Sequence, residues 1–218
     1  MLIKRVYSVA SLALLALTGC IPIKGEVSLN SSGTGIGVSP RPLVPGDGIA
    51  VLAESGADDD DGIALCVRDA VARASPAIRI MPAKQVRTAA GGLFGNAKAA
   101  LNFEEISRTL HDASARSSFV ALKLRYVFTV TGKTEDRNWH DSATSFIGYG
   151  SSRKSTNIEA VAWDAATGER LQSFQVDASG NPSLLIIGVL GILEYTPTES
   201  AACRDIGGQL ARSLSLGG

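Results

Sequence analysis

The first twenty residues constrain this chain most, because they decide where the folded protein begins. Lys4 and Arg5 precede an apolar run, Val6–Leu17, whose length is typical of a secretory signal. A transmembrane helix needs about 20 apolar residues, and Gly19 stops this run too early. We therefore predict that residues 1–19 are a cleaved signal peptide and take no part in the fold.

The end of this segment, Leu17-Thr18-Gly19-Cys20, resembles the lipobox of bacterial lipoproteins. In that family the cysteine thiol receives a diacylglycerol, the preceding peptide is removed, and the new amino terminus is acylated. Several acyl chains hold a protein firmly on a bilayer, whereas one binds only marginally. The resemblance implies lipidation at Cys20. Because Ile21 replaces the aspartate that retains lipoproteins in the inner membrane, it also implies the periplasmic face of the outer membrane. An ordinary cleaved signal with a chance cysteine is the alternative.

The composition of the remaining 199 residues favours one sizeable domain. Its 19 basic and 21 acidic residues lack the clustered basic excess of a nucleic-acid-binding protein, so we expect no nucleic-acid partner. Two further cysteines, Cys66 and Cys203, lie far apart in the sequence. In an oxidising compartment such a pair is a disulfide candidate. Burial as two free thiols is the alternative.

Glycine and proline are frequent just after the proposed anchor, in residues 21–47. This composition disfavours a packed element, so we predict a lipidated flexible tether over 20–47 and a single domain over 48–218.

Hydrophobic periodicity predicts an α/β (α+β) domain. Short apolar runs indicate strands over 48–53 and 77–83, and helical spacing of apolar residues predicts helices over 58–74, from Asn102 to Ala113, and over 196–214, the last with Thr196 as its cap. The segments 157–164 and 169–180 flank "AATG" and predict a hairpin with positive φ at Gly168. The apolar stretch 183–193 is too short to span a membrane as a helix; a buried strand and turn is favoured, and a lipid-dipping loop stays open.

The clearest predicted strand covers residues 118–132, where apolar residues alternate with a second set that includes Lys123 and Arg125. Period two places these cations on a partly wet face, which predicts a single mixed sheet with helices packed mainly on the other face. Residues 133–155 are rich in Ser and Gly and predict a polar insert.

Three local motifs resemble a family of envelope proteins: "GDGIAVLA", "YVFTVTGK" and "NIEAVAWDAATGERLQSF". The family includes the amino-terminal domain of the Tol translocation beta-propeller protein, the curli secretion lipoprotein, and the lipoprotein activators of penicillin-binding proteins. The resemblance covers residues 48–178 and implies the same type of fold. None of the three motifs names a catalytic residue.

An enzymatic role has little support in the sequence. The two histidines, His111 and His140, match no GxSxG, HExxH or CxxC pattern, and the neighbours Asp141 and Ser142 cannot supply triad geometry by themselves. We therefore expect no catalytic residue, no cofactor and no metal.

A lipid anchor followed by a compact domain favours a non-enzymatic binding or assembly adaptor of the cell envelope. We expect the membrane, reached through Cys20, and an envelope protein as its partners. A secretion-pore subunit similar to the curli lipoprotein is the alternative, and a periplasmic hydrolase is a weaker one. The candidate partner-binding residues are the cations of the wet face and the insert: Lys123, Arg125, Arg137, Arg153 and Lys154.

Overall fold

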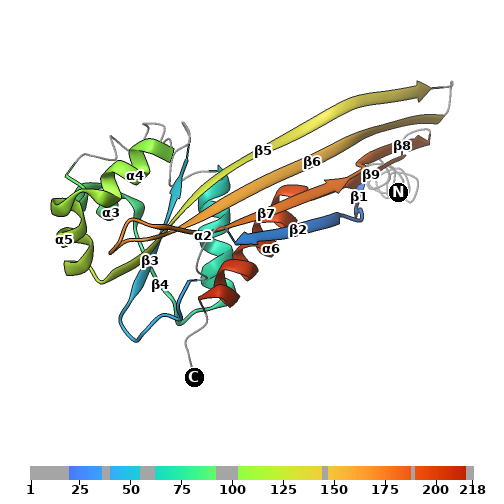
Figure 1. Cartoon of the computed structure of the whole chain (residues 1–218). Coiled ribbons are helices and arrows are strands. Elements are labelled where there is room, and N and C mark those ends of the chain that lie inside the picture. The colour runs from blue at the N-terminus through green and yellow to red at the C-terminus, as the bar shows by residue number, and fades with distance from the viewer. Residues whose placement is uncertain are drawn as a thin grey trace, which may run out of the picture. The chain divides into compact units, whose positions relative to one another are not determined.

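The computed structural model describes residues 20–35, 40–54, 62–91, 103–143, 147–187 and 190–214. The predicted signal peptide over 1–19 lies outside these residues. The chain divides into two compact units: unit 1 comprises Met1–Ser28, Glu135–Ser155 and Ser179–Thr198, and unit 2 comprises Leu29–Thr134, Thr156–Ala178 and Glu199–Gly218. Figure 1 labels the elements, which in chain order are β1 (Cys20–Lys24), β2 (Ser28–Gly35), β3 (Gly48–Ala53), α2 (Gly62–Ala74), β4 (Arg79–Met81), α3 (Ala83–Ala89), α4 (Phe103–His111), α5 (Ala113–Ala121), β5 (Leu124–Ala143), β6 (Ile147–Asp164), β7 (Arg170–Gly180), β8 (Ser183–Ile187), β9 (Leu190–Tyr195) and α6 (Thr198–Ser213).

Unit 2 is a layered α/β structure. Strand β3 pairs in parallel with β4 and β5; β6 lies beside β5, β7 beside β6, and β2 beside β7. The β6–β7 hairpin confirms its prediction, with Gly168 at φ 76°. Parallel pairs occur here and antiparallel pairs in unit 1, so the predicted mixed α/β fold is confirmed.

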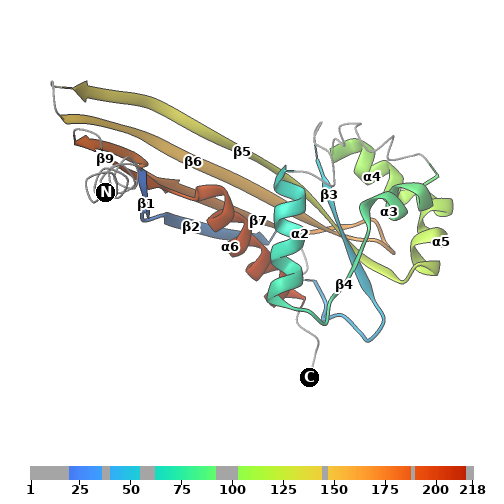
Figure 2. The ribbon, with the colours of Figure 1, turned by 180° about the vertical axis from the view of Figure 1, so that it is seen from behind.

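The helices of unit 2 cover both faces of its sheet, although the alternation in 118–132 had indicated one covered face. All six residues of β3 are buried, as expected for a parallel strand between two layers. One core cluster joins Ala50 and Leu52 to residues of α3, α4 and α5, among them Ile106 and Phe119. Helix α2 also packs on β3, and Figure 2 shows α2 and α6 against one side of the strands.

Helices α2 and α6 approach each other closely. Cys66 of α2 and Cys203 of α6 form the disulfide that was a candidate from the sequence, with Cα atoms 5.8 Å apart. Four residues further along each helix, a Cβ added to Gly207 would lie 2.5 Å from the Cβ of Ala70. Because residues i and i+4 share a helix face, one line of contact contains both the disulfide and the glycine.

In unit 1 the strands β1, β9, β8 and β6 lie side by side in this order, and the Glu135–Ala143 part of β5 lies beside β6. Strand β1 pairs in parallel with β9, while β8 forms antiparallel pairs with β9 and with β6.

Two predicted loops are strands. The tether predicted over 20–47 is wrong for residues 20–24 and 28–35, which form β1 and β2. The polar insert predicted over 133–155 is wrong as well, since β5 continues to Ala143 and β6 begins at Ile147. Composition alone misled in both places, because hydrogen bonds to neighbouring strands order a sequence of low intrinsic strand preference. The remaining domain limits, 1–19 and 48–218, stay predictions.

Two helix boundaries also differ. Residues 118–121, predicted as strand, belong to α5, which begins after Asp112: the Asp112 carboxylate accepts the N–H groups of Ser114 and Ala115, both at 2.9 Å. The predicted cap at Thr196 is wrong, since its buried hydroxyl has no hydrogen-bond partner among the described residues and Thr198 N–H donates instead to the Thr196 carbonyl.

Candidate functional site

Two of the five predicted partner-binding cations lie in unit 2, close to the start of β5. Lys123 is exposed in the turn before the strand, with φ at 55°. Arg125 is only 31% exposed at its side chain and forms a 2.9 Å ion pair with Asp164. Its guanidinium lies over the Tyr126 ring, 5.3 Å from the centroid. Burial tends to lower the pKa of Arg125, but Tyr126 and the Asp164 carboxylate outweigh burial and raise it above its ordinary value.

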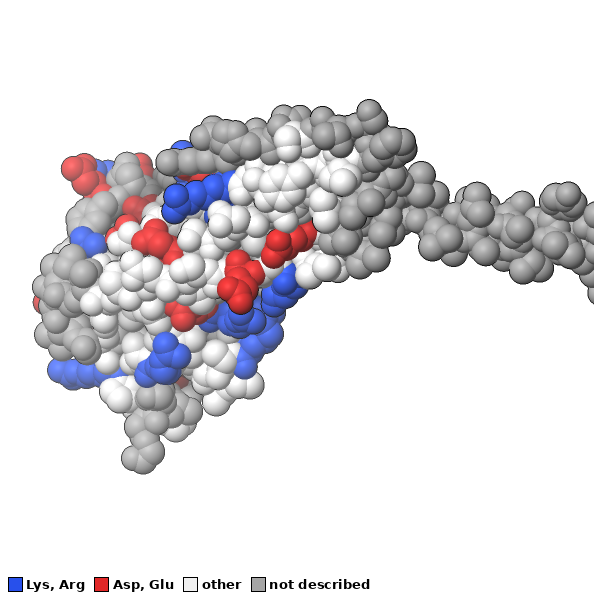
Figure 3. All heavy atoms as spheres, turned by 90° about the vertical axis from the view of Figure 1, so that its right-hand side faces the viewer, with Lys and Arg blue, Asp and Glu red and all other residues white. Residues whose placement is uncertain are grey.

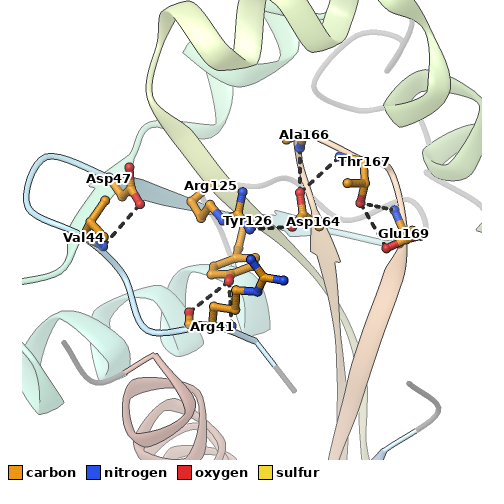
Figure 4. A network of polar contacts seen from close by, with 9 residues as sticks. All are labelled: Arg41, Val44, Asp47, Arg125, Tyr126, Asp164, Ala166, Thr167 and Glu169. Carbon is orange, nitrogen blue, oxygen red and sulfur yellow. Dashed lines mark hydrogen bonds and ion pairs between the residues drawn. The ribbon is translucent and has the colours of Figure 1, made fainter. Parts of the chain in front are cut away.

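Asp164 also organises the turn between β6 and β7 (Figure 4). Its carboxylate accepts the N–H groups of Ala166 at 2.8 Å and Thr167 at 3.1 Å. The Gly168 N–H donates to the Asp164 carbonyl at 2.8 Å. The Asp-x-x-Thr-Gly-Glu pattern of this hairpin is therefore the signature of a turn held by an aspartate, and Arg125 neutralises that aspartate.

The Tyr126 hydroxyl fastens the segment before β3 to β5. It donates to the Arg41 carbonyl at 2.9 Å and accepts the Arg41 N–H at 2.8 Å (Figure 4). The polar residues around Arg125 thus hold the fold together, and Lys123 is the more accessible of the two predicted cations.

The other three predicted cations belong to unit 1. Arg153 is exposed and Lys154 half-buried on β6, while Arg137 lies on β5. The five candidates therefore divide between the two units, and their role in binding a partner stays a prediction.

Of the residues considered for chemistry, His111 has a described contact, which lies within its own helix. The His111 ring nitrogen Nδ1 lies 2.7 Å from the Ser107 carbonyl of its own helix, which makes this nitrogen a donor. His140 and Asp141 lie on β5. Within the described ranges, no group of three His, Cys, Asp or Glu residues could hold a metal ion.

A wide cavity of about 1290 Å³ opens in unit 1. Its walls are mainly polar: Glu26, Glu194, Arg153, Asn181 and five serines line it, together with Tyr149. Ser183 Oγ donates to Glu194 Oε2 at 2.8 Å inside this wall. Sequence reasoning missed the cavity, because part of its wall comes from residues 26–28 and 149–153, which had been predicted as tether and insert.

Unit 1 also carries most of the exposed apolar surface. Among the described residues nine large apolar side chains are exposed, and six of them belong to unit 1: Ile23, Ile147, Tyr149, Ile186, Leu193 and Tyr195. On the face shown in Figure 3, uncharged side chains form an area bordered by acidic and basic ones. The buried strand predicted for 183–193 is therefore wrong at Ile186 and Leu193, although both residues do lie in strands.

None of the described helices has the length and the apolar character that a helix needs to span a membrane.

Comparison with known proteins gives only distant structural likeness. The sequence matches no family model and no curated protein. The chain is similar to the PelC dodecamer from Paraburkholderia phytofirmans, at 12% identity and a TM-score of 0.37 over 88% of this chain and 100% of that one. A single-residue variant of that dodecamer gives 13% identity and 0.39 over 87% and 99%. Lipoprotein GNA1162 from Neisseria meningitidis gives 16% and 0.32 over 65% and 83%. These values are too low to assign a family or a function.

Proposed function

We propose that this chain is a lipoprotein of the outer membrane, anchored through Cys20 on the periplasmic side, and that it acts as a non-enzymatic binding or assembly adaptor. The observation that carries the proposal is the sequence Leu17-Thr18-Gly19-Cys20, which resembles a lipobox and ends at the residue where β1 begins. Because β1 pairs with β9 from its first residue, the anchor belongs to a folded unit.

The disulfide supports the compartment. Cys66 and Cys203 are 137 residues apart and are joined between two helices. Structural disulfides are typical of secreted and periplasmic proteins and rare in the reducing cytosol.

The surface supports binding over catalysis. Asp164 and Arg125 neutralise each other and hold a turn, and His111 bonds to its own helix. The exposed residues include apolar side chains of unit 1 and cations such as Lys123 and Arg153. Such residues contribute to interfaces when they are brought together with a partner.

Two measurements on cell envelopes test the proposal. Outer and inner membranes are separated, and the wild-type chain is compared with Cys20→Ser; we expect the wild type in the outer membrane with a lipid-modified terminus, and the variant released from that fraction. Equal outer-membrane recovery of an unmodified variant would contradict the anchor.

The adaptor role is tested by cross-linking in intact cells followed by purification. Partners captured by the wild type should be lost on charge reversal of Arg153 and Lys154 or of Lys123. Arg73→Glu, an exposed charge reversal at the end of α2, is the matched control. Identical partners in all variants would refute a role for these cations.

A further inference from the structure

Apolar residues in unit 1 gather at one end of the paired strands. The pairing registers place β6, β8, β9 and β1 side by side in rows. Four successive rows contain no charged residue; we call these residues the apolar band, and they are Ile147–Gly150, Leu184–Ile187, Leu190–Leu193 and Cys20–Pro22. The next row contains Ser151, Ser183 and Glu194, where the polar cavity wall begins.

The exposed side chains of the apolar band lie on both faces of the sheet. Successive residues of a strand point to opposite faces, so Ile147 and Tyr149 share one face, and Ile186 and Leu193 share the other. Their exposed fractions are 51%, 48%, 42% and 38%. A sheet in water normally hides one face and wets the other. Here the apolar and polar residues are instead separated along the strand direction, with both faces apolar at one end of the strands. This is the arrangement of a structure that enters an apolar medium with that end first.

The position of Cys20 identifies that medium. Its register partner is Gly191, in the same row as Ile186 and Gly148, so the proposed anchor lies inside the apolar band. Acyl chains attached there would enter the bilayer beside these side chains. Four rows at about 3.3 Å per residue extend over ~13 Å, slightly more than the ~5–10 Å to which interfacial segments are buried.

The edge strand disfavours a second copy of the chain as the occupant. Gly25 N–H donates to the Tyr195 carbonyl at 2.8 Å. Because backbone groups alternate in direction along a strand, Pro22 points its nitrogen, which carries no hydrogen, away from β9. Proline at this position hinders the addition of another strand and leaves one donor fewer to satisfy near lipid.

The borders of the apolar band suit a lipid headgroup region. Lys24 and Arg153 are exposed just beyond it, where ammonium and guanidinium groups can reach phosphates. Tyr195, beyond the band, and Tyr149, inside it, are each about half exposed, and tyrosine is enriched at membrane interfaces. Strand β1, which begins at Cys20, lies at the edge of this group of strands and β6 at its opposite side, so the Cys20 side lies nearest the lipid.

We propose that the apolar band is a membrane-contacting surface, inserted into the interfacial region of the bilayer that holds the acyl chains of Cys20. The inference rests on the proposed anchor and deepens it: the bilayer touches protein side chains on both faces of the unit 1 sheet, and the anchor is a fixed attachment of that unit.

The test uses the full lipidated protein in vesicles of phosphatidylethanolamine and phosphatidylglycerol. Tyr149→Cys and Ile186→Cys each receive one nitroxide label, one on each face. The disulfide protects Cys66 and Cys203 from the label, and acylation protects Cys20. Electron paramagnetic resonance then measures accessibility to oxygen, which concentrates in lipid, and to a water-soluble nickel complex. Val120→Cys on α5, at 62% exposure, is the matched apolar control.

We expect the ratio of oxygen to nickel accessibility to rise several-fold at positions 149 and 186 on vesicle binding, and to stay unchanged at 120. Labels that remain open to nickel would overturn the inference, and so would labels shielded from both reagents, which indicate a protein partner or a second copy. If a label disturbs folding, Ile147→Cys and Leu193→Cys report the same two faces. The mass of the purified protein distinguishes the failure of the two proposals. A chain without acyl groups refutes the lipid anchor at Cys20. A lipidated chain whose labels stay accessible to nickel refutes only the contact of the apolar band with the bilayer.

Discussion

Replacing Gly207 by alanine should destabilise the protein, whereas the same change at its neighbour Gly208 should stabilise it. A Cβ at position 207 would lie 2.5 Å from the Ala70 Cβ and 3.0 Å from the Val71 backbone nitrogen, so α2 and α6 would have to separate. At position 208 the nearest atom is the mobile end of Arg212, at 3.3 Å.

The magnitudes follow from two opposing effects. Alanine in a helix is favoured over glycine by about 0.8–1 kcal/mol, and this gain applies to both variants. Overpacking costs about 1–3 kcal/mol and applies only to Gly207. The free energy of unfolding should therefore rise by up to ~1 kcal/mol for Gly208→Ala and lie about 1–3 kcal/mol lower for Gly207→Ala than for Gly208→Ala.

Urea denaturation with the disulfide intact measures both values, using the far-ultraviolet signal of the helices. A Gly207→Ala protein as stable as Gly208→Ala would refute the close approach of α2 and α6. It would also remove the packing argument for the neighbouring disulfide.

Three further predictions concern unit 2. Cys66→Ser/Cys203→Ser should lower the free energy of unfolding by up to about 5 kcal/mol, the chain-entropy value for a 137-residue separation; a denaturation midpoint equal to that of the oxidised wild type would contradict it. Asp164→Ala should lower the free energy of unfolding by roughly 1–3 kcal/mol. Asp164→Asn should lower it less, because asparagine keeps an acceptor for the turn; equal thermal stability of the two variants would count against the turn's dependence on Asp164. Burial, and to a lesser extent the Glu159 carboxylate, raise the pKa of Glu54, while Arg170 lowers it less. The folded state therefore binds the Glu54 proton more tightly than the unfolded state, and the free energy of unfolding falls as pH rises from the ordinary glutamate pKa to the raised one. Glu54→Gln should flatten that part of the profile of stability against pH, and an unchanged slope would show that Glu54 does not cause it.

The sequence predicted those elements whose signal is local. The β6–β7 hairpin follows from its alternating strands and Gly168. Cys66 and Cys203 were a candidate pair because an oxidising compartment permits a disulfide, and the structure joins them. The mixed α/β class follows from the same periodicities.

The predictions that were wrong concern residues whose structure depends on partners distant in the sequence. Strand β1 is ordered by β9, about 170 residues later in the chain, and nothing in "CIPIK" indicates that pairing. In the same way, Arg125, predicted to lie on the wet face, forms an ion pair with Asp164, which is 39 residues later in the chain. The apolar band could not be predicted from the sequence either, because it appears only when three pairing registers place four strands side by side.

The central claim is that Cys20 begins the mature chain and carries its lipid anchor. Mass spectrometry of the amino-terminal peptide, purified from outer membranes, tests it most directly. The account predicts a peptide that starts at Cys20 and is heavier by a diacylglycerol on sulfur and an acyl chain on nitrogen. A peptide that starts at Met1, or a free thiol at Cys20, would contradict it.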